Sequence, residues 1–431
     1  MQHEATKSNK TCANETTPED RLPRRTIRAR LLRALSICGP GLLVMLANSD
    51  AGSVVAAAQS GVQWGYRLAP LLLALFPVLY MVQELTVRLG IYTQKGHGEL
   101  IRERFGPTWA YLSVVGLVVA TTGTLVTEFT AVAGIGELYG VSRLISLPLS
   151  AAALIGIVTT GSYRRVERVA VIIGLFELAF FYVAWRSQPD LATIRQHVSD
   201  LPWRDHGFLF LAAALIGTVF NPWMIFYQQS AIAEKRLEAR DLPTARGETA
   251  IGALLTQCLT ISVLVAVAAT LGGHRSTVSL KSVGDISAML TPYLGVKFGR
   301  LVFGVGVLGA ATVAAVVASL AMAWGLGEVL GYQRSLEFKP GRSPWFYGGY
   351  VASVLTASVI VCISHDLVLV NIGAQVVNAL FLPFVLGLLA ALAADALPEE
   401  KRLKGFYFWL LLIGAAATAF LGVYGGLSSL F

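Results

Sequence analysis

The sequence predicts an all-α polytopic membrane protein. We expect an inverted repeat of five plus five helices followed by an eleventh helix, with helices 1 and 6 broken at midmembrane. Three observations lead to this fold class: the composition, a series of long apolar segments, and polar interruptions inside two of them. Of 431 residues, 55% are hydrophobic and 14% are charged, and the mean hydropathy is +0.63. Soluble domains carry about 25% charged residues, so a water-soluble class is excluded.

Eleven apolar segments follow one another along the chain, and all but a short fourth one have about the 18 or more residues that cross a bilayer. The polar residues 1–33 predict a disordered tail, and we expect residues 34–431 to form the transmembrane domain, with repeats at about 34–186 and 207–393. The apolar segments are approximately residues 38–63, 68–89, 109–134, 145–160, 166–185, 208–233, 251–271, 301–329, 345–363, 367–393 and 406–425.

The basic residues predict the orientation of these segments. With the N-terminus in the cytoplasm, 25 of the 34 Lys and Arg residues lie on the cytoplasmic side and nine lie outside. Cytoplasmic loops carry an excess of Lys and Arg, so we expect the N-terminus inside and the C-terminus outside. Helices 1 and 6 then cross in opposite directions, which is the relation that an inverted repeat requires.

The first segment contains the polar stretch Asn48-Ser49-Asp50-Ala51-Gly52-Ser53. A carboxylate in the middle of a span costs about 3 kcal/mol on insertion scales, so Asp50 is a candidate functional residue. Gly52 lacks a Cβ, and Ser49 and Ser53 offer hydroxyls to freed backbone groups, which favours an unwound turn. The carbonyl oxygens exposed at the end of a half-helix suit a cation.

The sixth segment is interrupted by Asn221-Pro222-Trp223-Met224. Pro222 has no N–H and clashes with the carbonyl four residues back, which frees acceptors around Thr218 and Val219. Two interrupted segments at corresponding places in two halves indicate the binding site of a transporter.

No sequence feature indicates an enzyme. The four cysteines are scattered and predict neither a disulfide nor a metal framework, and no nucleotide-binding motif is present. The net charge of +8 comes from basic residues that gather mainly on one side of the membrane, so nucleic acid is not an expected partner.

Several motifs resemble the NRAMP family of divalent-metal transporters, which has the LeuT-type fold. Gly39-Pro40-Gly41 followed by Asp50-Ala51-Gly52-Ser53 is similar to the family's Gly-Pro-Gly and Asp-Pro-Gly-Asn. Residues 59–66, 83–90, 375–378 and 382–384 resemble its next motif and its second and tenth helices.

The departures from the family pattern concern the metal site. Asn221 stands where the family has methionine, Trp223 where it has histidine, and Ser53 where it has asparagine. One carboxylate of the family's third-helix proton route is Glu128, and the other is Ala131. An amide oxygen in place of a thioether favours harder cations. The pattern resembles the prokaryotic branch of NRAMP-related magnesium transporters, which implies a prokaryotic inner membrane.

We expect Asp50 to be a metal ligand, with Asn221, the Ser53 hydroxyl and the carbonyls near Ala47 and Thr218 as further candidates. Alternatively, Asp50 is satisfied by hydroxyls at the break and Asn221 caps the broken helix. Glu128 is a candidate for the ion path. The resemblance implies that the remaining candidates face or wall the site: Gly52, Pro222, Trp223, Met224, Gln375 and Asn378.

These residues predict a monomeric transporter that moves Mg²⁺, and also Mn²⁺, into the cytoplasm without proton coupling. The metal is the transported substrate, and no cofactor is expected. Three alternatives remain: a proton-coupled Mn²⁺/Fe²⁺ importer, a sodium-coupled organic-solute symporter, and a metal sensor that does not transport.

Overall fold

The computed structural model describes residues 39–159, 175–270, 280, 284–288, 295–333 and 338–428. The chain divides into residues 1–36 and residues 37–431, and all described residues belong to the second unit. The tail predicted over residues 1–33 therefore lies outside the described residues. Every regular element of the described chain is a helix, as the sequence predicts.

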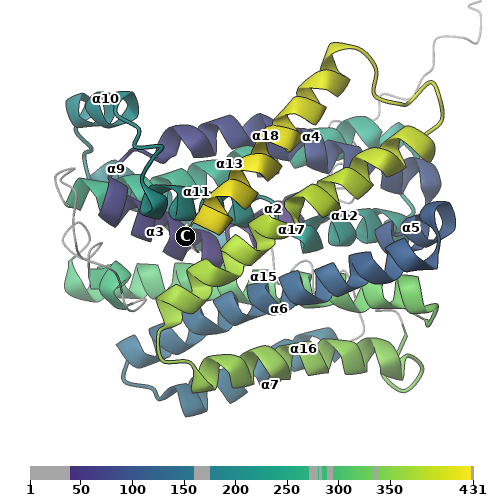
Figure 1. Ribbon diagram of the computed structural model, residues 1–431. Coiled ribbons are helices and arrows are strands. Elements are labelled where there is room, and N and C mark those ends of the chain that lie inside the picture. The colour runs from purple at the N-terminus through teal and green to yellow at the C-terminus, as the bar shows by residue number, and fades with distance from the viewer. Residues whose placement is uncertain are drawn as a thin grey trace, which may run out of the picture. The chain divides into compact units, whose positions relative to one another are not determined.

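The first half of the chain forms the helices that carry the first break (Figure 1). Proline at N1 or N2 begins several of these helices, where its missing N–H leaves no hydrogen bond unmade. The elements are α2 (Pro40–Asn48), α3 (Ala51–Trp64), α4 (Ala69–Thr93), α5 (His97–Phe105), α6 (Pro107–Leu138), α7 (Arg143–Thr159), η2 (Leu175–Leu178), α9 (Ala179–Arg186) and α10 (Leu191–Ser199).

The second half of the chain forms the helices that carry the second break. Gly331 ends its longest helix in a left-handed conformation, with φ 83°. The elements are α11 (His206–Val219), α12 (Pro222–Lys235), η3 (Ala239–Asp241), α13 (Leu242–Thr270), α15 (Val296–Leu330), α16 (Pro344–Ile363), α17 (Leu367–Asp395) and α18 (Phe406–Ser428).

Eight described helices are long and apolar enough to span a membrane, and nine spans result when the bent pair α2–α3 is counted as one. The predicted fourth segment forms the shorter apolar helix α7. Only part of the fifth segment is described, as η2 and α9, because residues 160–174 lie outside the described residues. The chain is thus a multi-pass membrane protein whose predicted segments coincide with helices wherever they are described.

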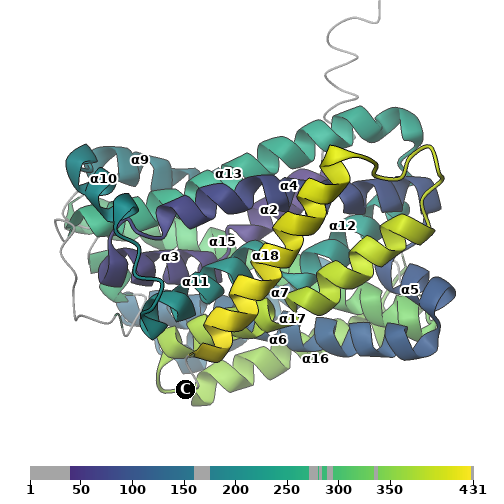
Figure 2. The ribbon, with the colours of Figure 1, turned by 45° about the horizontal axis from the view of Figure 1, so that its top comes forward.

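The broken helices lie at the centre of the bundle. In the span formed by α11 and α12 together, 94% of the most apolar 18-residue stretch is buried, compared with 22% of the corresponding stretch in α18. α13 packs against α2, α3 and α4, whereas α18 lies beside α11 and α17 at the periphery (Figures 1 and 2). α11 approaches α17 very closely: a Cβ on Gly217 would lie 1.8 Å from the Gln375 carbonyl oxygen, so only glycine fits there.

A buried carboxylate fixes the start of the first span. Glu248 Oε1, on α13, accepts hydrogen bonds from Gly39 N at 2.5 Å and Leu42 N at 2.7 Å. These N–H groups lie at the start of α2, where backbone N–H groups have no hydrogen-bond partner within their own helix. Through Glu248, α13 therefore fixes the position of the N-terminal end of α2.

Candidate metal site

The first span is broken between Asn48 and Ala51, as predicted. α2 ends at Asn48, α3 begins at Ala51, and the two half-helices are bent by 42°. Asp50 caps α3, because its Oδ1 accepts from Ser53 N at 2.7 Å. A Cβ on Gly52 would lie 1.9 Å from Gln375 Nε2, so glycine allows α17 to approach the break.

The second break lies between Val219 and Pro222. Asn221 is the N-cap residue of α12 and Pro222 occupies its first turn. The predicted free acceptors are present, and each is used by an amide: Asn221 Nδ2 donates to Thr218 O at 3.1 Å, and Asn48 Nδ2 donates to Val219 O at 3.4 Å.

The two breaks contact each other directly. Asn221 Nδ2 also donates to Asn48 Oδ1 at 3.2 Å, and both side chains are buried. Asn48 was not among the predicted site residues. Its position next to Ser49 and Asp50 inside an apolar segment is the signal that could have identified it.

Two side chains of α17 complete this face of the site. Asn378 Nδ2 donates to Asn221 Oδ1 at 2.6 Å and to Gln375 Oε1 at 3.1 Å. Gln375 and Asn378 are three residues apart and thus share a helix face. Both are fully buried, and Gln375 Nε2 and Asn378 Oδ1 have no hydrogen-bond partner among the described residues. Asn378 therefore contacts Asn221 directly, and Gln375 is connected to Asn221 only through Asn378.

The carboxylates at the break are only partly satisfied. Asp50 is fully buried, and its Oδ2 has no hydrogen-bond partner in the described structure. The Ser53 hydroxyl lies 2.7 Å from Asp50 Oδ1 and 2.9 Å from Asn48 O. Glu128 has the partner that its burial requires, because its Oε2 accepts from Ala51 N at 3.2 Å. Asp50 thus retains one oxygen without a donor among the described residues.

Other predicted site residues are buried beside the two breaks. Trp223 is fully buried, and its Nε1 donates to Thr124 Oγ1 at 3.2 Å. Met224 and Ala47 are also buried. Trp223 thus connects α12 to α6. Glu84 lies elsewhere in the bundle, where it forms ion pairs with Arg88 at 2.6 Å and with Arg246 at 2.5 Å, and we interpret it as structural.

The donor set is suited to a hard cation. Within the described ranges, no three His, Cys, Asp or Glu side chains are grouped closely enough to hold a metal ion. The break instead offers the Asp50 carboxylate, amide oxygens, a hydroxyl and backbone carbonyls. Mg²⁺ and similar cations bind one or two carboxylates and complete their shell with neutral oxygens and water.

A polar cavity of about 610 Å³ lies at the C-terminal ends of α12 and α15, and Ser230, Trp324 and Glu328 contribute to its lining. The loop before α5 closes against these helices. Gly98 N donates to Glu328 Oε2 at 2.8 Å, Ser230 Oγ donates to Glu328 Oε1 at 2.5 Å, and His97 Nδ1 lies 2.8 Å from Gln229 Oε1. We call His97, Gly98, Gln229, Ser230 and Glu328 the α5 clamp.

His97 in the α5 clamp is buried and lies outside the spans. Gln229 Nε2 donates to Lys95 O, so its Oε1 accepts the proton on His97 Nδ1. Desolvation by burial lowers the pKa of His97 to about 4. The imidazole is therefore neutral at physiological pH.

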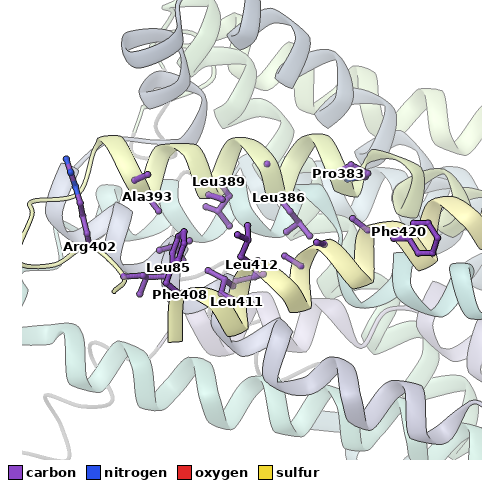
Figure 3. A pocket seen from close by; sticks show the side chains of 18 of the residues that line it. Leu85, Pro383, Leu386, Leu389, Ala393, Arg402, Phe408, Leu411, Leu412 and Phe420 are labelled. Atoms are coloured by element: carbon purple, nitrogen blue, oxygen red, sulfur yellow. The ribbon is translucent and has the colours of Figure 1, made fainter. Parts of the chain in front are cut away.

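A second cavity, of about 730 Å³, has the wrong chemistry for a cation. It lies between α4, α17 and α18, where Leu85, Leu386 and Phe408 face into it (Figure 3). Arg402 is the one charged side chain in its described lining, and no residue predicted for the metal site contributes to it. Apolar walls and a guanidinium exclude this cavity as a metal site.

The two crossed breaks are characteristic of the LeuT-type transporter fold. A structure of a Na⁺-coupled sialic acid symporter matches with a TM-score of 0.56 and 14% identity, covering 91% of this chain and 89% of that chain. A manganese transporter of Eremococcus coleocola matches with a TM-score of 0.71 and 16% identity, covering 93% and 87%.

The sequence comparison narrows this class to one family. The family model "Nramp: Natural resistance-associated macrophage protein-like" matches residues 41–428, so the chain belongs to the Nramp family. A relative from Yersinia pestis (strain Pestoides F), named "Divalent metal cation transporter MntH", is 28% identical over 300 residues, which are 67% of this chain and 71% of the relative. The predicted family is therefore confirmed, and these relatives are transporters rather than enzymes.

Proposed function

We propose that this protein transports divalent metal cations across the membrane. The observation that carries the proposal is the buried Asp50 carboxylate, which has an unpartnered oxygen at the point where two broken helices meet. An uncompensated charge inside a membrane protein is expensive, and a bound cation compensates it. Family membership supports the same class of cargo.

Mn²⁺ is the cargo that the comparisons favour, because similar proteins are named as manganese and divalent metal cation transporters. The Mn²⁺/Fe²⁺ importer therefore has more support from relatives than a magnesium transporter has. The chemistry of this chain supports Mg²⁺ as a second cargo. Asn221 offers an amide oxygen where the family has a methionine sulfur, and Met224 lies two residues beyond the proline rather than at that position. Carboxylate, carbonyl and amide oxygens suit both Mg²⁺ and Mn²⁺.

We further propose inward, uncoupled transport by a monomer in a prokaryotic inner membrane. With the N-terminus inside, an inside-negative potential favours divalent cation entry by about 4.6 kcal/mol per 100 mV. The described spans carry no histidine within their interior: His97 and His197 lie in helices between spans, and His206 begins α11. Histidine is the usual proton carrier near neutral pH, so this distribution supports transport without protons.

The test is uptake into proteoliposomes with Mn²⁺, Mg²⁺, Ca²⁺ and Na⁺ in parallel, using the wild-type protein and Asp50→Ala. We expect uptake of Mn²⁺ and Mg²⁺ by the wild type, and background uptake by a folded Asp50→Ala protein. Wild-type rates in Asp50→Ala would remove this residue from the site, and Mn²⁺ uptake that Mg²⁺ does not compete with would restrict the cargo to transition metals.

A pH-sensitive dye inside the same liposomes tests coupling. We expect no metal-dependent acidification. Acidification that disappears in Glu128→Gln would instead establish the proton-coupled Mn²⁺/Fe²⁺ importer.

A further inference from the structure

Glu177 is a third buried carboxylate near the break in the first span, besides Asp50 and Glu128. It lies in the 3-10 turn η2, immediately before α9, inside the fifth apolar segment. Its residue is 0% exposed, and neither Oε1 nor Oε2 has a hydrogen-bond partner among the described residues. A carboxylate in this environment is expensive unless something else compensates it.

Glu177 lies close enough to the break in the first span for its charge to interact with Asp50 and Glu128, and the Ser49 hydroxyl also acts on it. Ser49 Oγ lies 2.7 Å from Thr256 Oγ1 on α13, and α13 also packs against α9. Glu177 therefore approaches Asp50 from the side of α9 and α13, whereas Asn221 and Asn378 belong to α11, α12 and α17.

Three unpartnered acceptors thus belong to two carboxylates near Ser49. Asp50 Oδ2 and both oxygens of Glu177 are buried and lack donors. No Lys or Arg is among the groups that act electrostatically on Glu177. A divalent cation carries enough charge to balance two ionised carboxylates, so a further acid beside Asp50 lowers the cost of holding the ion in the low-dielectric interior.

We propose that Glu177 is a second carboxylate for the transported divalent cation, which it binds beside Asp50 on the Ser49 and Thr256 side of the break. The two hydroxyls supply neutral oxygens to the ion or to its water shell. This assignment rests on the proposed function, and it adds a ligand that selects a double charge over a single one.

The first test compares Glu177→Gln with Glu137→Gln in Mn²⁺ and Mg²⁺ uptake. Glu137 lies on α6 and forms a partly exposed pair with Arg143 at 2.8 Å, so it is the matched control. We expect the KM for both ions to rise about 10- to 100-fold in Glu177→Gln, as for the loss of a group that supports a metal site. We expect little change in Glu137→Gln. An unchanged KM in folded Glu177→Gln would overturn the proposal.

A second test needs no variant and therefore does not depend on folding. Dicyclohexylcarbodiimide modifies buried carboxyl groups, and mass spectrometry of the wild-type protein locates the modification. We expect labelling of Glu177 without metal and protection by Mn²⁺ over the concentration range that protects Asp50. Absence of labelling, or labelling of Glu177 that Mn²⁺ does not reduce while Asp50 is protected, would contradict the proposal. Loss of uptake in Asp50→Ala tests the function itself independently of both outcomes.

Discussion

The break between α2 and α3 and the α5 clamp are both buried polar regions, but their carboxylates are satisfied differently. In the clamp, Glu328 accepts from Gly98 N and Ser230 Oγ. At the break, Asp50 Oδ2 and both oxygens of Glu177 lack a described partner. Donors of the protein thus satisfy both oxygens of Glu328, whereas the carboxylates near the break keep oxygens that a cation can use.

Glu248 is a further buried carboxylate that stabilises the fold, at the start of α2. It accepts from Gly39 N and Leu42 N and so anchors the start of the same half-helix whose other end precedes Asp50. One short helix therefore begins at a carboxylate oxygen that accepts two of its N–H groups and ends beside a carboxylate with an unpartnered oxygen.

The largest expected effect is on transport, in Asp50→Asn. Asparagine keeps an oxygen that accepts from Ser53 N, but it removes the charge that interacts with Glu128 and Glu177. We expect metal uptake to fall to background while the melting temperature does not fall. A large loss of thermal stability would show that Asp50 belongs with the structural carboxylates.

Glu328→Ala is the converse change. It leaves Gly98 N–H and the Ser230 hydroxyl without this acceptor, and each unsatisfied buried donor costs about 1–3 kcal/mol. We therefore expect the free energy of unfolding to decrease by about 2 to 6 kcal/mol in denaturant titrations. Unchanged stability together with lost metal binding would assign Glu328 to the cation site instead.

The α5 clamp should also respond to acid. The pKa of His97 is lowered from 6.5 to about 4, so the unfolded state binds more protons than the folded state between these values. Stability is then fully present above about pH 6.5 and decreases as pH falls toward 4, by at most about 3 kcal/mol. Hydrogen exchange of the α5 segment should accelerate over this range in the wild type.

His97→Gln is the control for this pH dependence, because glutamine is neutral throughout the range. We expect its exchange to be independent of pH once the intrinsic rates are corrected. Equal pH dependence in both proteins would attribute the effect to groups other than His97.

The smallest expected effect is a change of preference in Asn221→Met. A thioether in place of the amide oxygen favours softer ions. We expect the ratio of Mn²⁺ to Mg²⁺ uptake to rise by about tenfold, or about 1.4 kcal/mol. Competition between the two ions measures this ratio, and an unchanged ratio would mean that Asn221 does not set selectivity.

The sequence predicted both breaks because their causes are local. Pro222 cannot continue the hydrogen bonding of a helix, and Asp50 with Gly52 interrupts an apolar segment. The long apolar segments likewise predicted the helices, since a single residue pattern determines each of them. The short fourth segment was also correctly distinguished from the longer ones.

The missed residues depend on contacts between distant segments. Glu248 and Glu328 are ordinary glutamates in the sequence, and only the packed fold brings them to the N–H groups of α2 and α5. The sequence did not indicate that Asn48 would meet Asn221, 173 residues away. Glu177 lies in a segment that we interpreted only as a span, although a lone acid inside such a segment was the available signal.

The hydrogen bond from Asn378 to Asn221 has a consequence for how tightly cargo is held. The 2.6 Å contact occupies an oxygen that the cation would otherwise use. The Asn378 amide thus occupies the Asn221 oxygen until a cation binds and displaces it, and the hydrogen bond forms again when the cation leaves. Such an exchange subtracts from the gross binding energy, which favours turnover over storage. It also spares the vacant carrier an unsatisfied Asn221 oxygen during its return across the membrane.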